Sequence, residues 1–231
     1  MCFSAGASFG AAAILCVAGT VTIKKAKNPS QLMFAAIPLL FGMQQLTEGF
    51  VWLSFNNPAF ESYHSPMMYA FLFFAQIFWP SWVPISIWNM ETDKKRKKSL
   101  AYLGLLGLAG SALLAYRLIY LPVSSNIEGH HIQYQIVSHQ WIIISSSILY
   151  VLSTLGSPLV SSLKYMKGLS LIMLTALVVT QIFYAHYLIS VWCFFSALLS
   201  TRIYFILQNS RDWSHLHSLL HKRINPDKME W

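Results

Sequence analysis

Apolar segments of membrane-spanning length alternate with short polar stretches along the 231-residue chain. A helix needs about 20 apolar residues to cross the hydrocarbon core of a bilayer. The pattern predicts seven such helices, at residues 4–23, 31–54, 67–89, 99–121, 138–158, 168–186 and 188–207. The last two form one apolar run that is too long for a single span and that fits two helices joined by a tight turn near His186. We therefore expect an all-α integral membrane protein, with a seven-helix bundle over residues 1–207 and a tail over residues 208–231.

The predicted helix at 31–54 carries polar side chains at membrane depth. Phe41, Gln44, Gln45, Glu48 and Trp52 recur at helical spacing and share one face. A carboxylate in hydrocarbon costs several kcal/mol, so this face is expected to turn toward polar partners or water inside the bundle. Two interpretations stay open: a functional site built on Glu48, or a polar face that joins helices through hydrogen bonds.

Composition and charge define the class and the orientation of this bundle. The chain is 55% hydrophobic and only 10% charged, which is too apolar for an ordinary soluble domain of this length. Outside the predicted helices, Lys and Arg occur only in residues 24–27, 94–98, 164–167 and 211–228. The positive-inside rule then predicts an N-terminus outside and a C-terminus in the cytoplasm. It also accounts for the net charge of +8 through contact with the lipid bilayer, without a nucleic-acid partner.

Two further spans carry polar residues that this orientation places in the outer half of the membrane or near it. In the helix at 67–89, Pro80 cannot donate to the carbonyl of Gln76, so either a kink or a polar site is expected there. In the helix at 99–121, Arg117 is the only cation well inside a span on the outer side. Arg117 is expected either to pair with Glu48 or to extend toward the outer interface.

Other polar side chains follow the same trend. The segment from Pro122 to Val137 is expected to be a loop, and the next helix carries His139, Ile143, Ser146, Tyr150 and Ser153 on one face. The outer halves of the spans therefore form the predicted site. The candidate ligand-binding residues are Gln44, Gln45, Glu48, Trp52, Gln76, Trp79, Arg117, His139, Gln181 and Trp192.

A metal site at the outer face is a second possibility. Zinc takes three protein ligands plus water in catalytic sites, and thiolates also suit copper. The residues able to reach the outer face as ligands are Cys2, Glu48, His131, His139, His186 and Cys193. Cys2 and Cys193 are also the one cysteine pair that the topology allows to meet, as a disulfide, as metal ligands or simply as packed side chains.

The tail at 208–231 contains RDWSHLHSLLHKR, in which Trp213, Leu216 and Leu220 lie on one side of a helix. His217 and His221 have the spacing of a zinc-binding pair, but no carboxylate lies between them. An amphipathic helix on the cytoplasmic membrane surface is the favoured interpretation.

Four segments carry a resemblance: the opening MCFSAGASF, PLLFGMQQLTEGFVW at 38–52, FWPSWVP at 78–84 and SVWCFFSALLS at 190–200. With them, the chain resembles an uncharacterised family of bacterial multipass membrane proteins over most of its length. The resemblance implies the inner membrane of a bacterium and no particular activity.

Three classes of function remain. The first is a protein that binds or transports a small polar or cationic solute in an outward-facing pocket walled by Trp52, Trp79 and Trp192. The second is a metal-dependent membrane hydrolase, and the third is a structural or partner-binding subunit. Every Lys lies outside the predicted spans, so a retinal Schiff base is excluded, and no P-loop or zinc-protease motif is present.

Overall fold

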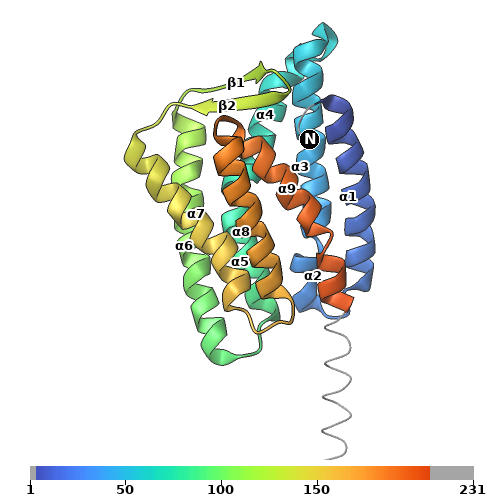
Figure 1. The fold of residues 1–231 in the computed structure, drawn as a ribbon, viewed down its shortest axis with the longest axis vertical. Coiled ribbons are helices and arrows are strands. Elements are labelled where there is room, and N and C mark those ends of the chain that lie inside the picture. Colours follow the sequence, from blue (N-terminus) through green and yellow to red (C-terminus); the bar gives the residue numbers. More distant parts are fainter. Residues whose placement is uncertain (1–3, 209–231) are drawn as a thin grey trace, which may run out of the picture.

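A computed structural model describes residues 4–208 as a bundle of helices with a β-hairpin across one end (Figure 1). Within the described part, the α-helices are α1 (Ala5–Lys25), α2 (Pro29–Ala35), α3 (Ile37–Asn56), α4 (His64–Leu72), α5 (Trp79–Met90), α6 (Lys94–Tyr120), α7 (Gln140–Val160), α8 (Met166–Phe183) and α9 (Leu188–Ser200). Shorter helical elements are η1 (Pro58–Tyr63), the π-helix η2 (Phe73–Phe78) and η3 (Ala185–Tyr187). The predicted tail helix and Cys2 lie outside the described residues.

Five helical segments of the described chain are long and apolar enough to cross a membrane. They are α1, the continuous segment Pro58–Met90, α6, α7 and α8. The described structure is therefore mostly helical, as predicted, and has several helices of membrane-spanning length and composition. Each of the seven predicted segments overlaps observed helix, although 31–54 is divided at Ala36 into α2 and α3, and 188–207 comprises α9 and a short helical stretch at 203–208.

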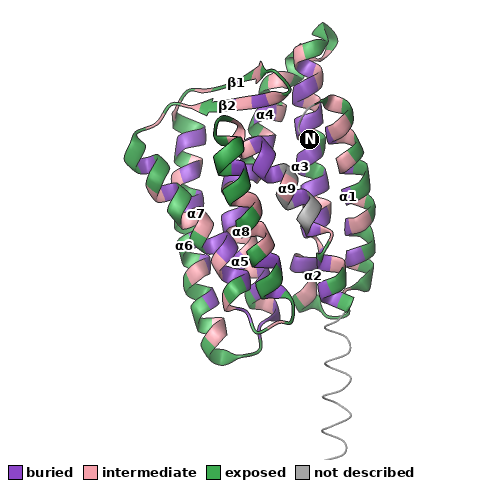
Figure 2. Ribbon diagram, viewed as in Figure 1, coloured by how far each residue is buried: buried purple, intermediate pink, exposed green. Residues whose placement is uncertain are grey.

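The surface of the bundle suits contact with lipid. Figure 2 shows exposed residues along the outward sides of α1, α6 and α7 and buried residues on the sides that face the interior. Large apolar side chains are among the exposed ones: Ile14, Leu105 and Ile119 expose 66%, 62% and 70% of their surface. In water such a surface would favour aggregation, whereas in a bilayer it costs nothing to expose it to acyl chains.

Residues 122–137 form a β-hairpin, so the prediction of an irregular loop was wrong. Strand β1 (Val123–Glu128) pairs antiparallel with β2 (His131–Ile136), and the turn between them includes Gly129 at a φ of +61°. Glycine adopts this backbone conformation without steric cost. Apolar residues alternate along β2, and the side chains of Ile132 and Tyr134 are buried against the helices.

The break predicted at Pro80 is a π-helical turn, η2, immediately before α5. Ser111 of α6 donates a hydrogen bond to the carbonyl of Ile77 at 2.6 Å, and its hydroxyl also lies 2.8 Å from that of Ser81. A neighbouring helix therefore supplies a hydrogen bond to the backbone of this segment, at the carbonyl next to that of Gln76. The two helices come very close here: a Cβ on Gly107 would lie 1.9 Å from the Pro80 carbonyl oxygen.

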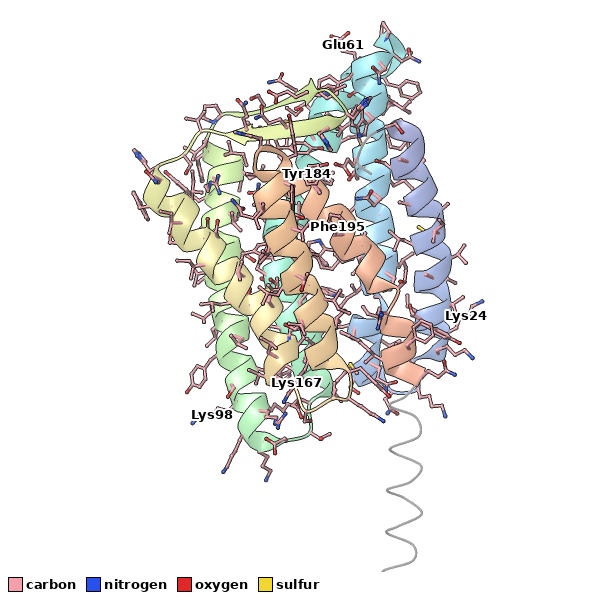
Figure 3. The ribbon with its side chains drawn as sticks, in the orientation of Figure 1. Lys24, Glu61, Lys98, Lys167, Tyr184 and Phe195 are labelled. Atoms are coloured by element: carbon pink, nitrogen blue, oxygen red, sulfur yellow. The ribbon has the colours of Figure 1, made fainter. Side chains whose placement is uncertain are left out.

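The two ends of the bundle differ in charge. Figure 3 shows Lys24, Lys98 and Lys167 at the end opposite the hairpin, whereas Glu61 and Tyr184 lie at the hairpin end. The run of basic residues at 94–98 opens α6 at this lysine-rich end. The lysines of three separate segments therefore converge on one end of the folded bundle, as the sequence orientation requires.

Glu91 joins two turns at the lysine-rich end. One of its carboxylate oxygens accepts hydrogen bonds from the backbone N–H of Ser162 at 2.7 Å and the hydroxyl of Ser161 at 3.1 Å. The other accepts from the backbone N–H groups of Thr92 and Asp93 and from the Ser162 hydroxyl. Burial raises the pKa of Glu91, but the hydrogen bonds from Ser162, Asp93 and Ser161 outweigh it, so the pKa lies below its ordinary value.

Candidate functional site

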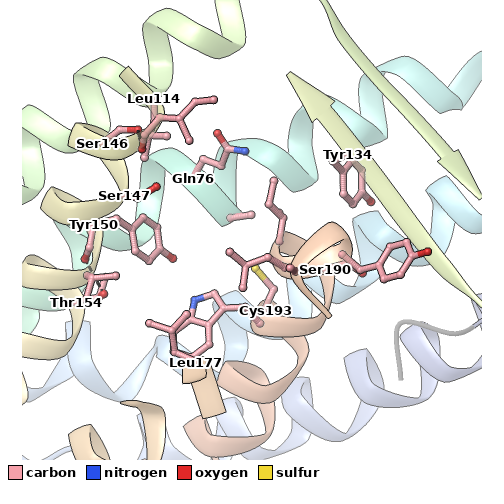
Figure 4. Close-up of a pocket in the computed structure, with 18 of the residues that line it drawn as sticks. Gln76, Leu114, Tyr134, Ser146, Ser147, Tyr150, Thr154, Leu177, Ser190 and Cys193 are labelled. Atoms are coloured by element: carbon pink, nitrogen blue, oxygen red, sulfur yellow. Dashed lines mark hydrogen bonds between the residues drawn. The ribbon is translucent and has the colours of Figure 1, made fainter. Parts of the chain in front are cut away.

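The candidate site is a cavity of about 300 Å³ inside the bundle, beneath the hairpin (Figure 4). Its walls come from η2, α6, β2, α7, α8, η3 and α9. Its polar lining comprises Gln76, Arg117, Tyr134, Ser146, Ser147, Tyr150, Thr154, His186, Tyr187, Ser190 and Cys193. The rest of the wall is apolar, with Leu114, Ile132, Leu155, Leu177 and Trp192 among its residues.

Some of the hydroxyl groups that line the cavity already donate their hydrogen atoms to backbone carbonyls. The hydroxyl of Ser146 donates to the carbonyl of Ile143, and that of Thr154 donates to the carbonyl of Tyr150. Such side chains turn only acceptor lone pairs toward a cavity. These oxygens can accept hydrogen bonds from a donor group of a ligand, but they do not determine the chemical class of that ligand.

Arg117 is the charged residue of the lining. It exposes 9% of its surface, and its Nε has no hydrogen-bond partner among the described residues. The expected pairing with Glu48 is not found among the described residues, where Glu48 accepts from Ser190 and Gln45 instead. The alternative, an extension of Arg117 toward the outer interface, stays a prediction. Arg117 lines the cavity from the last turn of α6, near the hairpin.

Glu48 lies behind the cavity wall, in a polar cluster between α3, α5 and α9. It is fully buried, accepts a hydrogen bond from the Ser190 hydroxyl at 2.5 Å and accepts another from Gln45 at 3.3 Å. The Trp79 indole donates to Gln44 at 2.7 Å and stacks on Phe41 with ring centroids 3.9 Å apart. Since Ser190 also lines the cavity, this side chain connects the cluster to the cavity.

The structure thus separates the predicted ligand-binding residues into three groups. Those that line the cavity are Gln76, Arg117 and Trp192. Those that are buried outside its lining are Gln44, Gln45, Glu48, Trp52 and Trp79. The remaining two, His139 and Gln181, are exposed near helix ends.

One wall of the cavity was partly visible in the sequence. Ile143, Ser146 and Tyr150 of α7 belong to the predicted polar face, and all three line the cavity. The lining residues on β2, Ile132 and Tyr134, were missed because their segment was expected to be a loop. Apolar residues at alternate positions from 132 to 136 were the signal that could have revealed them.

The hairpin is held over the cavity by contacts on both sides. On one side, the His64 ring lies between two hydroxyls, with Nδ1 2.8 Å from Ser54 and Nε2 3.0 Å from Ser125 of β1. On the other side, the Tyr187 hydroxyl donates to Glu128 at 3.0 Å. The hairpin therefore forms a fixed roof.

The cavity reaches the surface beside this roof, between α7 and η3. Four of its lining residues are exposed there: Ile143 and Ser147 on α7, and Ala185 and His186 on η3. We define these four residues as the mouth. It lies at the end of the bundle that carries the hairpin, opposite the lysine-rich end.

The described members of the predicted metal set do not assemble. Within residues 4–208, no group of three or more His, Cys, Asp or Glu side chains is arranged to hold a metal ion. His131 stacks on Tyr187 with ring centroids 4.6 Å apart, and burial lowers its pKa. His186 lies at the mouth, His139 is exposed, and Glu48 and Cys193 are buried near each other. Cys2, and with it the predicted Cys2–Cys193 pair, lies outside the described residues.

The chain belongs to DUF6629, a family of unknown function, whose profile matches residues 1–216. This confirms the resemblance to an uncharacterised family. Neither a curated protein nor a solved structure matches the chain. Function must therefore be argued from the cavity and its mouth.

Proposed function

We propose that this protein binds or transports a small solute in the cavity beneath the hairpin. In this proposal the chain crosses the inner membrane of a bacterium seven times, with its N-terminus outside and its C-terminus in the cytoplasm. The described helices form the membrane domain, and the tail beyond residue 207 lies on the cytoplasmic surface.

The observation that carries the proposal is the shape and chemistry of the cavity. At about 300 Å³ it could hold roughly ten molecules of liquid water. Ligand sites are typically concave and mostly apolar, with a few placed polar groups. The cavity has these features, because Gln76, Arg117 and Ser190 interrupt a largely apolar wall.

The placement of charge supports an outward-facing mouth. Lys24, Lys98 and Lys167 lie at the end opposite the hairpin, and the positive-inside rule assigns such an end to the cytoplasm. The mouth lies at the hairpin end and would then open toward the outside.

The same geometry limits the alternative in which all polar residues only join helices. That interpretation fits Glu48, which accepts hydrogen bonds from Ser190 and Gln45, and Gln44, which accepts one from Trp79. The Nε2 of Gln44 and the Oε1 of Gln45 have no hydrogen-bond partner among the described residues, but neither residue lines the cavity. It fits Arg117 and Gln76 less well, because both line the cavity and the Nε of Arg117 and the Oε1 of Gln76 have no hydrogen-bond partner among the described residues. Buried polar atoms that lack a hydrogen-bond partner beside a cavity favour the interpretation that a ligand fills the cavity.

Blocking the mouth tests the proposal. In Ser147→Trp a large ring would occupy the mouth, whereas Ser145→Trp, two residues away on α7, places the same ring outside the lining. Thermal unfolding in lipid nanodiscs would be measured with octanoate, octanol and octylamine as probes, because ligands that bind the folded state raise the unfolding temperature.

We expect at least one probe to raise the unfolding temperature of the wild type and of Ser145→Trp, and to have little effect on Ser147→Trp. If no probe stabilises the wild type, or if Ser147→Trp responds as strongly as the control, the cavity is not a solute site of this kind.

A further inference from the structure

We propose that the ligand of the cavity is a small amphipathic anion: a monocarboxylate with an apolar tail, held through its carboxylate by Arg117. This inference rests on the proposed function and assigns the chemical class of its ligand. It replaces the cationic solute expected from the sequence, because the charge that borders the cavity is positive.

The positive charge of Arg117 is not balanced by an acidic residue of the described lining. The described lining of the cavity contains Arg117 and no Asp or Glu. The carboxylate of Glu48 lies behind the wall and accepts hydrogen bonds from Ser190 and Gln45. A buried charge without a partner is costly, and a carboxylate can offer a guanidinium two parallel hydrogen bonds. A bound carboxylate would therefore supply what the protein lacks at this position.

Gln76 is a second buried polar residue of the cavity lining. Gln76 lines the cavity from η2, which packs against α6, and Figure 4 shows Gln76 close to Leu114, one helical turn from Arg117. The Gln76 side chain exposes 6% of its surface, and its Oε1 has no hydrogen-bond partner among the described residues. Gln76 and Arg117 thus both line the cavity from elements that pack on each other, and their polar groups could hold a small head group and an accompanying water.

A mostly apolar region adjoins the main cavity. A second cavity of about 50 Å³ shares four wall residues with the first: Tyr150, Thr154, Trp192 and Cys193. Its other walls are mostly apolar, with Phe41, Ile87, Leu169 and Met173 among them. The shared residues stand between the two cavities, where Tyr150 and Trp192 hydrogen-bond each other. An apolar tail in the main cavity would gain burial by packing against this wall.

The size of the main cavity limits the length of this tail. A volume of about 300 Å³ corresponds to roughly ten non-hydrogen atoms, if each occupies about as much space as a water molecule in the liquid. Octanoate has this size. The mouth also suits an amphiphile, because Ile143 and Ser147 lie on α7 within the membrane domain while His186 lies at its outer edge.

The test compares eight-carbon probes that differ only in head group. Binding of octanoate, octanol and octylamine would be measured by calorimetry on the full chain in neutral lipid nanodiscs, for the wild type, Arg117→Gln and Arg117→Lys. We expect octanoate to bind the wild type most tightly and octylamine least tightly. Loss of a charge-assisted pair should weaken octanoate binding to Arg117→Gln by about tenfold to a hundredfold, with little change for octanol. Arg117→Lys should be intermediate, since it keeps the charge and loses the fork geometry.

A thermal unfolding measurement without probe separates a binding role of Arg117 from a structural one. If Arg117 serves a ligand, Arg117→Gln removes an unpaired buried charge and leaves the unfolding temperature of the empty protein unchanged or higher. A marked decrease together with unchanged octanoate affinity would assign Arg117 to the fold and overturn the inference.

The remaining outcomes are also decisive. If octanol or octylamine binds as tightly as octanoate, and Ser147→Trp abolishes that binding, the cavity is a solute site but the anionic class is wrong. If no probe binds, both proposals fail. Palmitate is too long for the cavity and should bind more weakly than octanoate, so tighter binding of palmitate would overturn the proposed size and point to fatty acids of the membrane.

Discussion

Gly107 allows α6 to approach the broken segment of helix before α5. The absence of a side chain here lets the carbonyl of Pro80 pack directly against the α6 backbone. One turn nearer the lysine-rich end, Gly104 has open space where a Cβ would be. Two glycines of the same helix, with the same sequence appearance, therefore have different structural roles.

Substituting Ala at these two positions tests this difference. Gly107→Ala should force α5 and α6 apart and destabilise the protein by about 1–3 kcal/mol, the usual cost of overpacking. Gly104→Ala should be neutral or slightly stabilising, because Ala favours the helix over Gly by up to about 1 kcal/mol. Thermal unfolding of the two variants side by side provides the measurement. Equal effects would mean that the helices do not meet at Gly107.

The chemistry of single residues predicted which side chains are buried better than it predicted which of them meet. The cost of a carboxylate in lipid predicted that Glu48 would face inward, and it is fully buried. The partner of Glu48 could not be predicted, because Ser190 is 142 residues away and only the packing of α9 on α3 brings the two together. The position of Arg117 beside a cavity depended in the same way on the arrangement of several helices.

At the scale of elements, helices were predictable and the hairpin was not. An apolar run of membrane length constrains the chain strongly, since backbone groups in lipid must be hydrogen-bonded within the segment. The segment 122–137 is short and polar at many positions, and its strands form only because β2 can place Ile132 and Tyr134 on the helices beneath. The position of the hairpin over the cavity therefore depends on tertiary packing and not on its local sequence alone.

The turn anchor at Glu91 provides a prediction at this scale. The pKa of Glu91 is lower in the folded protein than its ordinary value of 4.5, so its hydrogen bonds contribute stability above that pH. This contribution should disappear as the pH falls through 4.5 and then through the lower pKa of the folded state. Glu91→Gln should cost about 1–3 kcal/mol at pH 7, because buried donors lose a charged acceptor.

Unfolding temperatures of the wild type and Glu91→Gln would be compared from pH 7 to pH 3. The gap between them should be constant near neutrality and should narrow in acid. A gap that persists unchanged at low pH would show that the ionised carboxylate is not what joins the two turns.

At the scale of the whole molecule, the distribution of charge and of apolar surface both suit a bundle that lies in a membrane with its lysine-rich end on one side. The lysines converge on the end opposite the hairpin, while large apolar residues cover the sides of the bundle. The sequence predicted this distribution because orientation in a membrane is governed by loop charge and by segment length. It could not predict the cavity, which is the space that remains once helices far apart in the sequence have packed.

Crystallography with 8-bromooctanoate tests the existence of a ligand site in that space most directly. The bromine gives an anomalous signal that marks the end of the tail independently of the protein. We expect a bromine peak inside the bundle beside Trp192 and Thr154, with the carboxylate at Arg117, and no such peak in Ser147→Trp. Bromine found only among the lipids around the helices, with the cavity of the wild type free of ligand, would contradict the account.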